Sequence, residues 1–114
     1  MIIEPKTFEG FNRILTGVVV PRPIAFVSTI SDTGRVNIAP YSFFAASSDN
    51  PPLLIFSSAK YNSEGKLKDS LANIEHNEEF VVNVVVENIV ESMNMAAAEY
   101  PQNVSEFDIV GLTA

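Results

Sequence analysis

The chain has 114 residues, 46 % of them hydrophobic, which is enough for one domain spanning residues 1–114 with a core of its own. It contains no cysteine and one histidine, which excludes disulfides, thiolate catalysis and the common zinc sites. The net charge of −7 argues against nucleic acid as a partner. The sequence has neither the pattern of a signal peptide nor a run of about 18 apolar residues, so we expect a cytoplasmic protein that does not span a membrane.

The first half of the chain has the pattern of a short helix followed by antiparallel strands. Apolar residues repeat at helical spacing over 7–15, and β-branched residues then dominate up to residue 30. Gly34 in the sequence SDTG supplies the positive φ that a hairpin turn requires. The predicted elements are a helix at 7–15, strands at 17–23 and 24–30, a turn at 31–34, a strand at 35–44, a turn at 49–52, and a third strand of the same sheet at 53–58.

The second half alternates between helical and strand patterns. After a polar loop, we predict a helix at 66–77, a strand at 79–86, a helix at 88–100 and the beginning of a turn from residue 105. The strand, EFVVNVVV, is expected to be buried on both faces apart from Asn83, whose amide must then find hydrogen-bond partners. Together these elements predict a small β-barrel with added helices, and the abrupt end suggests either a fragment or a chain whose sheet is completed elsewhere.

Charge and hydroxyl groups gather where the predicted helix 66–77 begins. Every lysine and arginine lies at or before Lys68, so this part of the chain must supply any positive charge for an anion. Ser57 and Ser58 end a predicted strand, and Lys66, Lys68 and Ser70 lie near the helix start. Free backbone N–H groups and the positive dipole end would suit a phosphate there. The residue pattern equally fits ordinary first-turn residues and solvated lysines.

The segment APYSFFAAS places aromatic residues beside small ones. Small residues allow a close approach of backbone to a flat aromatic ligand, and Tyr41, Phe43 and Phe44 offer apolar faces. Core packing at a sheet corner explains the same residues and is the simpler interpretation. Elsewhere, His76 lies among acidic residues at a polar helix end, and the neighbouring glutamates give no reason for a raised pKa, so no catalytic acid or base emerges.

Six blocks in order resemble the flavin reductase-like family of FMN-binding split barrels, which includes flavoredoxin. These blocks are RPIAFVST (22–29), GRVNIAPYSFF (34–44), DNPPLLIFSS (49–58), KDSLANI (68–74), EFVVNVV (79–85) and EFDIVGLT (106–113). The resemblance implies a mainly β fold with helices, an antiparallel, Greek-key-like split β-barrel that here stops before its closing strands. It also implies a homodimer with FMN near the subunit interface.

The resemblance also implies which residues contact the cofactor. The isoalloxazine ring would lie along residues 39–45, and the phosphate end would lie near the start of the helix. The implied contacts are Ala39, Pro40, Tyr41, Ser42, Phe43, Phe44 and Ala45 with Ser28 and Thr29 nearby, and Ser57, Lys68 and Ser70 at the phosphate. Family members commonly have threonine where this chain has Ser70, which keeps the hydroxyl group.

Three functions are compatible with this resemblance. The first is a flavin reductase that uses NADH or NADPH, in which the cofactor performs the hydride chemistry and no catalytic side chain is needed. The second is a flavin-binding electron carrier without nicotinamide turnover of its own. The third is a truncated, non-catalytic remnant, against which the intact set of cofactor-contacting residues argues.

Overall fold

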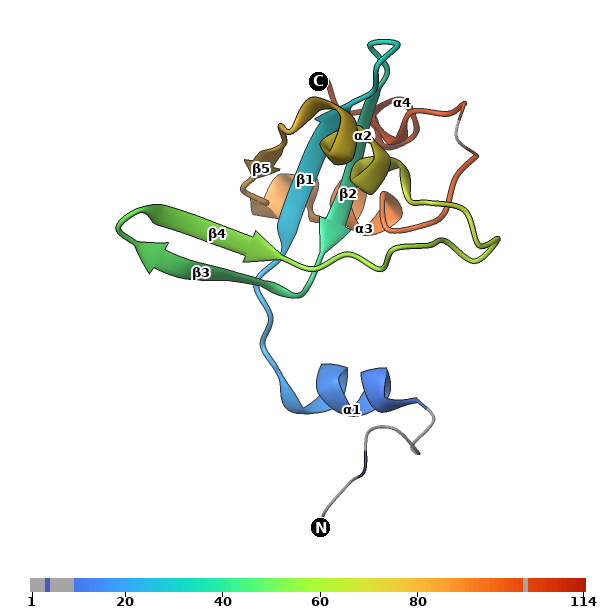
Figure 1. Ribbon diagram of the computed structural model, residues 1–114. Helices are drawn as coiled ribbons and strands as arrows, with labels where there is room; N and C mark the ends of the chain where they lie inside the picture. The colour runs from blue at the N-terminus through green and yellow to red at the C-terminus, as the bar shows by residue number, and fades with distance from the viewer. Residues whose placement is uncertain (1–3, 5–9, 102) are drawn as a thin grey trace.

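A three-stranded antiparallel sheet in the order β2-β1-β5 forms the centre of the molecule, and the β3–β4 hairpin projects from it (Figure 1). The computed structural model describes Glu4, residues 10–101 and residues 103–114. The elements are α1 (Phe11–Val18), β1 (Ala25–Ile30), β2 (Val36–Tyr41), β3 (Phe44–Asp49), β4 (Pro52–Phe56), α2 (Asp69–Asn77), β5 (Val81–Asn83), the 3₁₀ turn η1 (Glu87–Ile89), α3 (Val90–Met95) and α4 (Glu106–Val110). None of the helices in these described parts is long and apolar enough to cross a membrane.

The β1–β2 hairpin forms as its sequence predicts. Ala25 pairs with Tyr41 and Ile30 with Val36, so both strands keep one register throughout. The turn is closed by the Gly34 N–H, which donates to the Ser31 carbonyl at 3.0 Å. Gly34 has φ 83°, a conformation that glycine adopts without a Cβ clash.

The alternation of strand side chains divides the core between the two faces of the sheet. Phe26 and Ile38 pack on one face against α3 and α4, through Ala96, Phe107 and Val110. On the other face, Ala25, Val27 and Tyr41 form a second cluster, and α2 covers the same side. Figure 1 shows α2 in front of β1 and β2 and α3 behind them. The central sheet is therefore covered by helices on both faces.

The predicted strand at 17–23 does not form. α1 continues to Val18, and the chain then runs irregularly to Ile24; the predicted helix start at residues 7–9 lies outside the described residues. Pro21 and Pro23 lack the N–H that a strand needs. Between them, Arg22 Nη1 donates to the Thr16 carbonyl at 2.6 Å and satisfies the end of α1. The valines suggested a strand, whereas the prolines and this contact end a helix.

The predicted strand at 35–44 ends early, at Tyr41, and the predicted third strand at 53–58 belongs to another sheet. β2 ends at Tyr41, and β3, which the sequence did not predict, begins at Phe44 and pairs with β4 across the predicted turn. Tyr41 and Phe44 both contact the same core cluster. Their spacing of three would place them on opposite faces of a straight strand, so the chain must bend between them.

The second half contains more irregular structure than its pattern suggests. α2 begins at Asp69 rather than residue 66, because Leu67 forms a β-bridge with Tyr61. β5 has three residues, and the prediction that 79–86 is buried on both faces is wrong, since Val84 is 83 % exposed. β5 pairs only with β1, so its outer side has no covering element in the described chain. The helix predicted at 88–100 is reduced to η1 and α3.

The predicted hydrogen bonding of Asn83 is confirmed. Its Nδ2 donates to the Phe26 carbonyl at 3.0 Å and to Ser28 Oγ at 3.1 Å. These bonds join β5 to β1 beyond the short backbone ladder. Asn83 therefore has a structural role in holding the edge strand.

Replacing Asn83 with leucine should lower the free energy of unfolding by about 1 kcal/mol, because the net value of such hydrogen bonds is of that size. Denaturant unfolding followed by circular dichroism measures the change. Asn94→Leu is the matched control, since Asn94 is exposed on α3 and its replacement should alter stability by less than about 0.5 kcal/mol. Equal effects of the two substitutions would contradict a structural role for the Asn83 amide.

Candidate functional site

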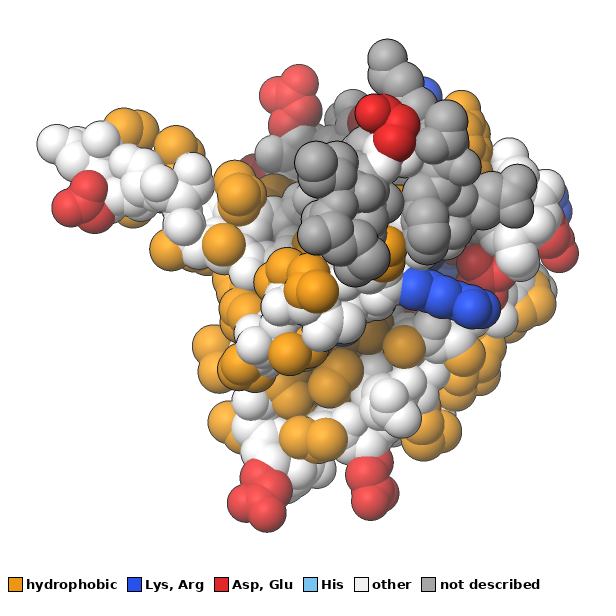
Figure 2. Space-filling view, turned by 90° about the horizontal axis from the view of Figure 1, so that it is seen from below, with side chains coloured by type: hydrophobic (Ala, Val, Ile, Leu, Met, Phe, Trp, Pro, Cys, Tyr) orange, Lys and Arg blue, Asp and Glu red, His pale blue; other side chains and the backbone are white. Residues whose placement is uncertain are grey.

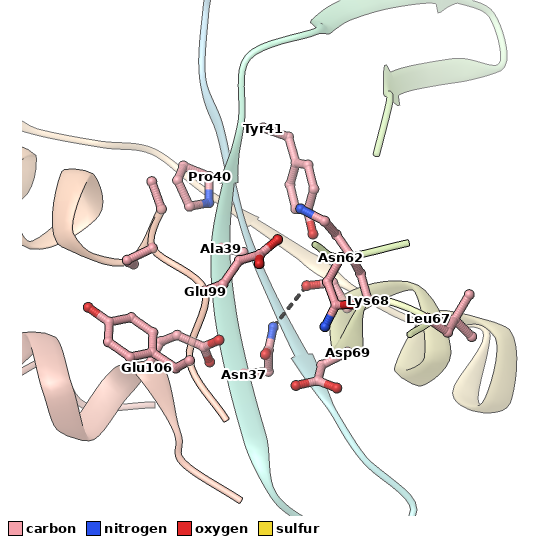
Figure 3. Close-up of a pocket in the computed structure, with 15 residues that line it drawn as sticks. Asn37, Ala39, Pro40, Tyr41, Asn62, Leu67, Lys68, Asp69, Glu99 and Glu106 are labelled. Atoms are coloured by element: carbon pink, nitrogen blue, oxygen red, sulfur yellow. Dashed lines mark hydrogen bonds between the residues drawn. The ribbon is translucent and has the colours of Figure 1, made fainter. Parts of the chain in front are cut away.

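A cavity of about 100 Å³ lies where α2 begins, beside β2 and the segment that follows α3 (Figure 3). We refer to it as the α2 cavity. Five of the residues predicted to contact the cofactor meet here, although they come from distant parts of the chain. The α2 cavity is lined by Asn37, Ala39, Pro40, Tyr41, Asn62, Leu67, Lys68, Asp69, Ser70, Ala96, Ala97, Ala98, Glu99, Tyr100 and Glu106.

The start of α2 presents unpaired backbone donors to this cavity. Lys68 is the N-cap and makes no side-chain capping bond, and the bond from Ala72 N–H to the Lys68 carbonyl, 3.0 Å long, closes the first turn. The N–H groups of the first turn before Ala72 thus lack helical acceptors. Lys68 also lines the cavity. The helix end and the ammonium group together favour an anion.

The other lysine near this helix does not take part. Lys66 Nζ pairs with Glu64 at 2.7 Å, and the two side chains are 61 % and 66 % exposed. The Glu64 hydrogen bond and charge raise the pKa of Lys66. Lys66 is absent from the lining of the α2 cavity. Of these two lysines, only Lys68 lines the α2 cavity.

Two buried polar residues, Asn37 and Glu106, line the α2 cavity without having been predicted. Asn37 lies in β2 and is in contact with both Ser70 and Glu106. Burial raises the pKa of the Glu106 carboxyl group. Each is a single polar residue in an otherwise ordinary element, and only the packing of α2 and α4 around β2 brings them together. In the sequence, the one sign of a polar site here was Asn37, an asparagine within the pattern of a strand.

Glu99 stabilises the wall of the α2 cavity that the 62–66 turn and the segment after α3 contribute. Its carboxylate accepts hydrogen bonds from the Ser63 hydroxyl and from the Ser63 N–H, the latter at 3.1 Å. These bonds lower the pKa of Glu99, and the nearby Lys68 acts in the same direction. They join the 62–66 turn to the segment after α3. The wall is thus held by contacts between segments distant in sequence.

A second hollow lies at the base of the β3–β4 hairpin and holds the other group of predicted contacts. We refer to this space of about 270 Å³ as the Phe43 groove. The guanidinium carbon of Arg22 lies 5.7 Å from the centre of the Phe43 ring, within the range of a cation–π contact. Arg22 was not predicted to belong to any site. The groove is lined by Val19, Pro21, Arg22, Pro23, Ser42, Phe43, Phe44, Ala45, Ile55 and Ser57.

Ser28 and Thr29 lie in neither of these spaces. Both border a wide groove of about 680 Å³ along β5. Thr29 is 6 % exposed and its hydroxyl accepts a hydrogen bond from Asn73 at 3.0 Å. Ser28 accepts a hydrogen bond from Asn83. The structure does not bring these two residues together with the other predicted contacts, and their role toward a cofactor stays a prediction.

Exposed apolar side chains extend from the hairpin over the underside of the molecule (Figure 2). Val18 is 70 % exposed, and Leu54 and Ile55 are 54 % and 56 % exposed. Ile55 also borders the Phe43 groove. Contiguous apolar surface of this kind is characteristic of a contact with another protein segment.

Comparison with known proteins places the chain in a family. A family model described as the flavin reductase like domain matches residues 17–114. The chain belongs to the flavin reductase-like family. An uncharacterized protein from Aquifex aeolicus is 46 % identical over 112 residues, which are 98 % of this chain and 57 % of that protein. The suspected resemblance is therefore confirmed.

Solved structures of flavin reductase-like proteins share the fold. Nitrilotriacetate monooxygenase component B from Bacillus cereus is 36 % identical with a TM-score of 0.86. The match covers 99 % of this chain and 56 % of that protein. The 2-nitrobenzoate 2-nitroreductase of Pseudomonas fluorescens is 34 % identical with a TM-score of 0.80. The match covers 97 % of this chain and 52 % of that protein.

A split-barrel protein from Shewanella frigidimarina, 21 % identical with a TM-score of 0.78, shows the same fold over 99 % of this chain and 57 % of its own. The predicted fold, antiparallel sheets with helices as in the split barrels, is confirmed. The chain spans about half the length of the curated relatives it matches.

Proposed function

We propose that the protein binds FMN and acts as an NAD(P)H-dependent flavin reductase. The observation that carries this proposal is the α2 cavity, where Lys68 and a helix N-terminus lie beside the small residues at the end of β2. A phosphate group requires positive charge and N–H donors, and both are supplied there. Membership of the flavin reductase-like family supports the same cofactor class.

The sizes of the two spaces fit a division of the cofactor between them. About 100 Å³ at the α2 cavity suits a phosphate group and is below the range of about 300 Å³ or more typical of whole-ligand pockets. The Phe43 groove has an aromatic ring, a guanidinium group and the small residue Ala45, which suit a flat ring system. We assign Lys68 and Ser70 to the phosphate end and residues 39–45 to the ring. Ser57, which the resemblance placed at the phosphate, borders the Phe43 groove and not the α2 cavity, so we assign it to the ring as well.

Under this assignment no side chain has to act as a catalytic acid or base. A flavin held there would itself supply the hydride chemistry with a reduced nicotinamide. The residues of the chain have to bind it, orient it and limit the access of water. Glu106 is buried away from the Phe43 groove, and His76 is exposed at the end of α2. Neither residue borders the groove assigned to the ring.

The second candidate is a flavin-binding electron carrier that does not turn over nicotinamide. It would use the same two spaces, so the described geometry supports it equally. Steady-state oxidation of NADH and NADPH with added FMN separates the two functions, since only the reductase consumes the nicotinamide.

A second copy of the chain is part of the proposal. The exposed side chains of Leu54, Ile55 and Val84 and the open edge of β5 need a covering partner in water. A two-fold dimer would supply the same patch from both subunits. Its proximity to the Phe43 groove, through Ile55, agrees with a cofactor held near a subunit interface.

The purified protein should retain FMN through dialysis and show the near-ultraviolet and visible absorbance bands of a flavin. Protein mixed with FMN and dialysed against buffer is the test, with riboflavin in a parallel sample. We expect more FMN than riboflavin to remain, because only FMN carries the phosphate. Absence of flavin absorbance in both dialysed samples would contradict the proposed function.

A further inference from the structure

Arg22 is a cation in the wall of the Phe43 groove to which the described residues provide no counter-charge. The other residues that line the groove are apolar or carry a hydroxyl group. No aspartate or glutamate of the described residues forms an ion pair with Arg22, and the one ion pair found between these residues joins Lys66 to Glu64. Arg22 is half-buried, so its charge has lost part of its water without gaining an acid. Such a charge favours the arrival of a negatively charged group.

The guanidinium group of Arg22 is held at a defined place. Its Nη1 donates to the Thr16 carbonyl, and its central carbon lies over the Phe43 ring, 5.7 Å from the ring centre. Pro21 and Pro23 restrict the backbone φ angle on either side of it. The positive charge is therefore fixed beside the aromatic face of the groove.

The hydrogen-bonding capacity of this guanidinium group is used only in part. A guanidinium group has N–H donors on three nitrogens and no acceptor. Toward the described chain only Nη1 donates, to the carbonyls of Thr16 and Val19 at 2.6 and 3.4 Å. Nε is buried and has no hydrogen-bond partner among the described residues. Buried donors without an acceptor are rare in folded proteins, so an acceptor brought by a ligand would be favourable here.

We propose that Arg22 makes the Phe43 groove selective for a flat ring system that carries a negative charge. A guanidinium group suits this role because it is planar, stays charged and lies well against aromatic rings. Phe43 supplies an apolar face and Arg22 supplies the charge, so a neutral ring uses only the first of these two features. That the ring system is a flavin rests on the proposed function.

Under the proposed function, Arg22 distinguishes the two redox forms of the cofactor. The chemistry that a flavin supplies is the uptake of a hydride from C4 of the reduced nicotinamide, which brings both electrons and the hydrogen and needs no further proton. The flavin ring gains one negative charge by this transfer, and the nicotinamide gains one positive charge. Arg22 offers a compensating charge to the reduced ring and none to the oxidised, neutral ring. We therefore expect Arg22 to strengthen the binding of reduced FMN more than that of oxidised FMN.

The test has to separate the charge of Arg22 from its structural role at the end of α1. Arg22→Gln removes the charge and keeps N–H donors, and Arg22→Lys keeps the charge and loses the planar group. Each protein is titrated without oxygen, once with oxidised FMN and once with FMN reduced by dithionite. The ratio of the oxidised to the reduced dissociation constant is the readout. A general loosening of the fold weakens both forms alike and cancels from this ratio.

The ratio should fall roughly tenfold in Arg22→Gln, which is the size of one hydrogen bond to a charged group. The midpoint potential of bound FMN should fall with it by about 30 mV, the equivalent of a tenfold change for a two-electron couple. Arg22→Lys should lie between Arg22→Gln and the wild type. Arg13→Gln is the matched control and should equal the wild type, because Arg13 is exposed on α1 and does not border the groove.

The possible outcomes separate this proposal from the proposed function. An unchanged ratio in Arg22→Gln, or an equal fall in Arg13→Gln, would overturn the role of Arg22 while FMN binding stands. Failure of the wild-type protein to bind either form of FMN would overturn both. The expected fall in a protein that does not oxidise NADH or NADPH would support the role of Arg22 and refute only the proposed reductase activity.

Discussion

Replacing Phe26 with alanine should destabilise the protein by about 3–5 kcal/mol, the usual cost of removing a large aromatic side chain from a core. Phe26 is 1 % exposed and lies at the centre of the cluster that joins β1 and β2 to α3 and α4. The surrounding side chains come from both sheet and helices, so they cannot close the space by a local shift. Denaturant unfolding at neutral pH measures the change.

Phe80→Ala is the matched control for this substitution. Phe80 is 41 % exposed and makes an edge contact with the Phe56 ring, 5.2 Å between centres. Its removal gives up less buried surface and leaves no enclosed cavity, so we expect a loss smaller than half that of Phe26→Ala. Similar losses at the two positions would mean that the core is not centred on Phe26.

Replacing Lys68 with alanine should weaken FMN binding by about 1–3 kcal/mol while leaving riboflavin binding nearly unchanged. Lys68 lines the α2 cavity, and its charge would be lost only from the interaction with the phosphate group. Flavin fluorescence quenching gives both dissociation constants under identical conditions. Their ratio removes any general effect on the fold.

Lys66→Ala provides the control for Lys68, because it removes the same charge two residues away. Lys66 is paired with Glu64 at the surface and does not line the cavity. We expect its FMN and riboflavin affinities to match those of the wild type. Equal losses of FMN affinity in both lysine variants would show that general surface charge, and not the α2 cavity, attracts the phosphate.

Local patterns predicted the parts of the fold that local forces determine. The β1–β2 hairpin follows from strand alternation and a turn containing Gly34, and both signals lie within 17 residues, 25–41. α4 was missed because a five-residue helix is stabilised chiefly by burying Phe107 and Val110 against the sheet. The exposed valines at positions 81, 84 and 86 were misjudged because apolar composition does not reveal whether a neighbour is present.

In the candidate site, too, the features set by neighbouring residues were predictable from the sequence, and those set by tertiary packing were not. The helix start at Lys68 was recognisable from residue types, and the structure places it beside Ala39 and Tyr41 because α2 packs on β1 and β2. Asn37, Glu106 and Arg22 were not predicted, since each makes its decisive contact with a residue in another element or segment. The sequence contains these residues but not the tertiary packing that gives them a common surface.

The projecting β3–β4 hairpin has a consequence for the proposed site. Its two arms are closed at the base by the Ser57 N–H, which donates to the Phe43 carbonyl at 2.9 Å, and the base is joined to the central sheet through the Tyr41 and Phe56 rings, 4.9 Å apart. β4 carries exposed apolar side chains, among them Leu54 and Ile55. Ile55 also forms part of the wall of the Phe43 groove. A second copy that covers β4 would therefore touch a residue of the groove, so the surface proposed for assembly and the space proposed for the flavin ring share a side chain.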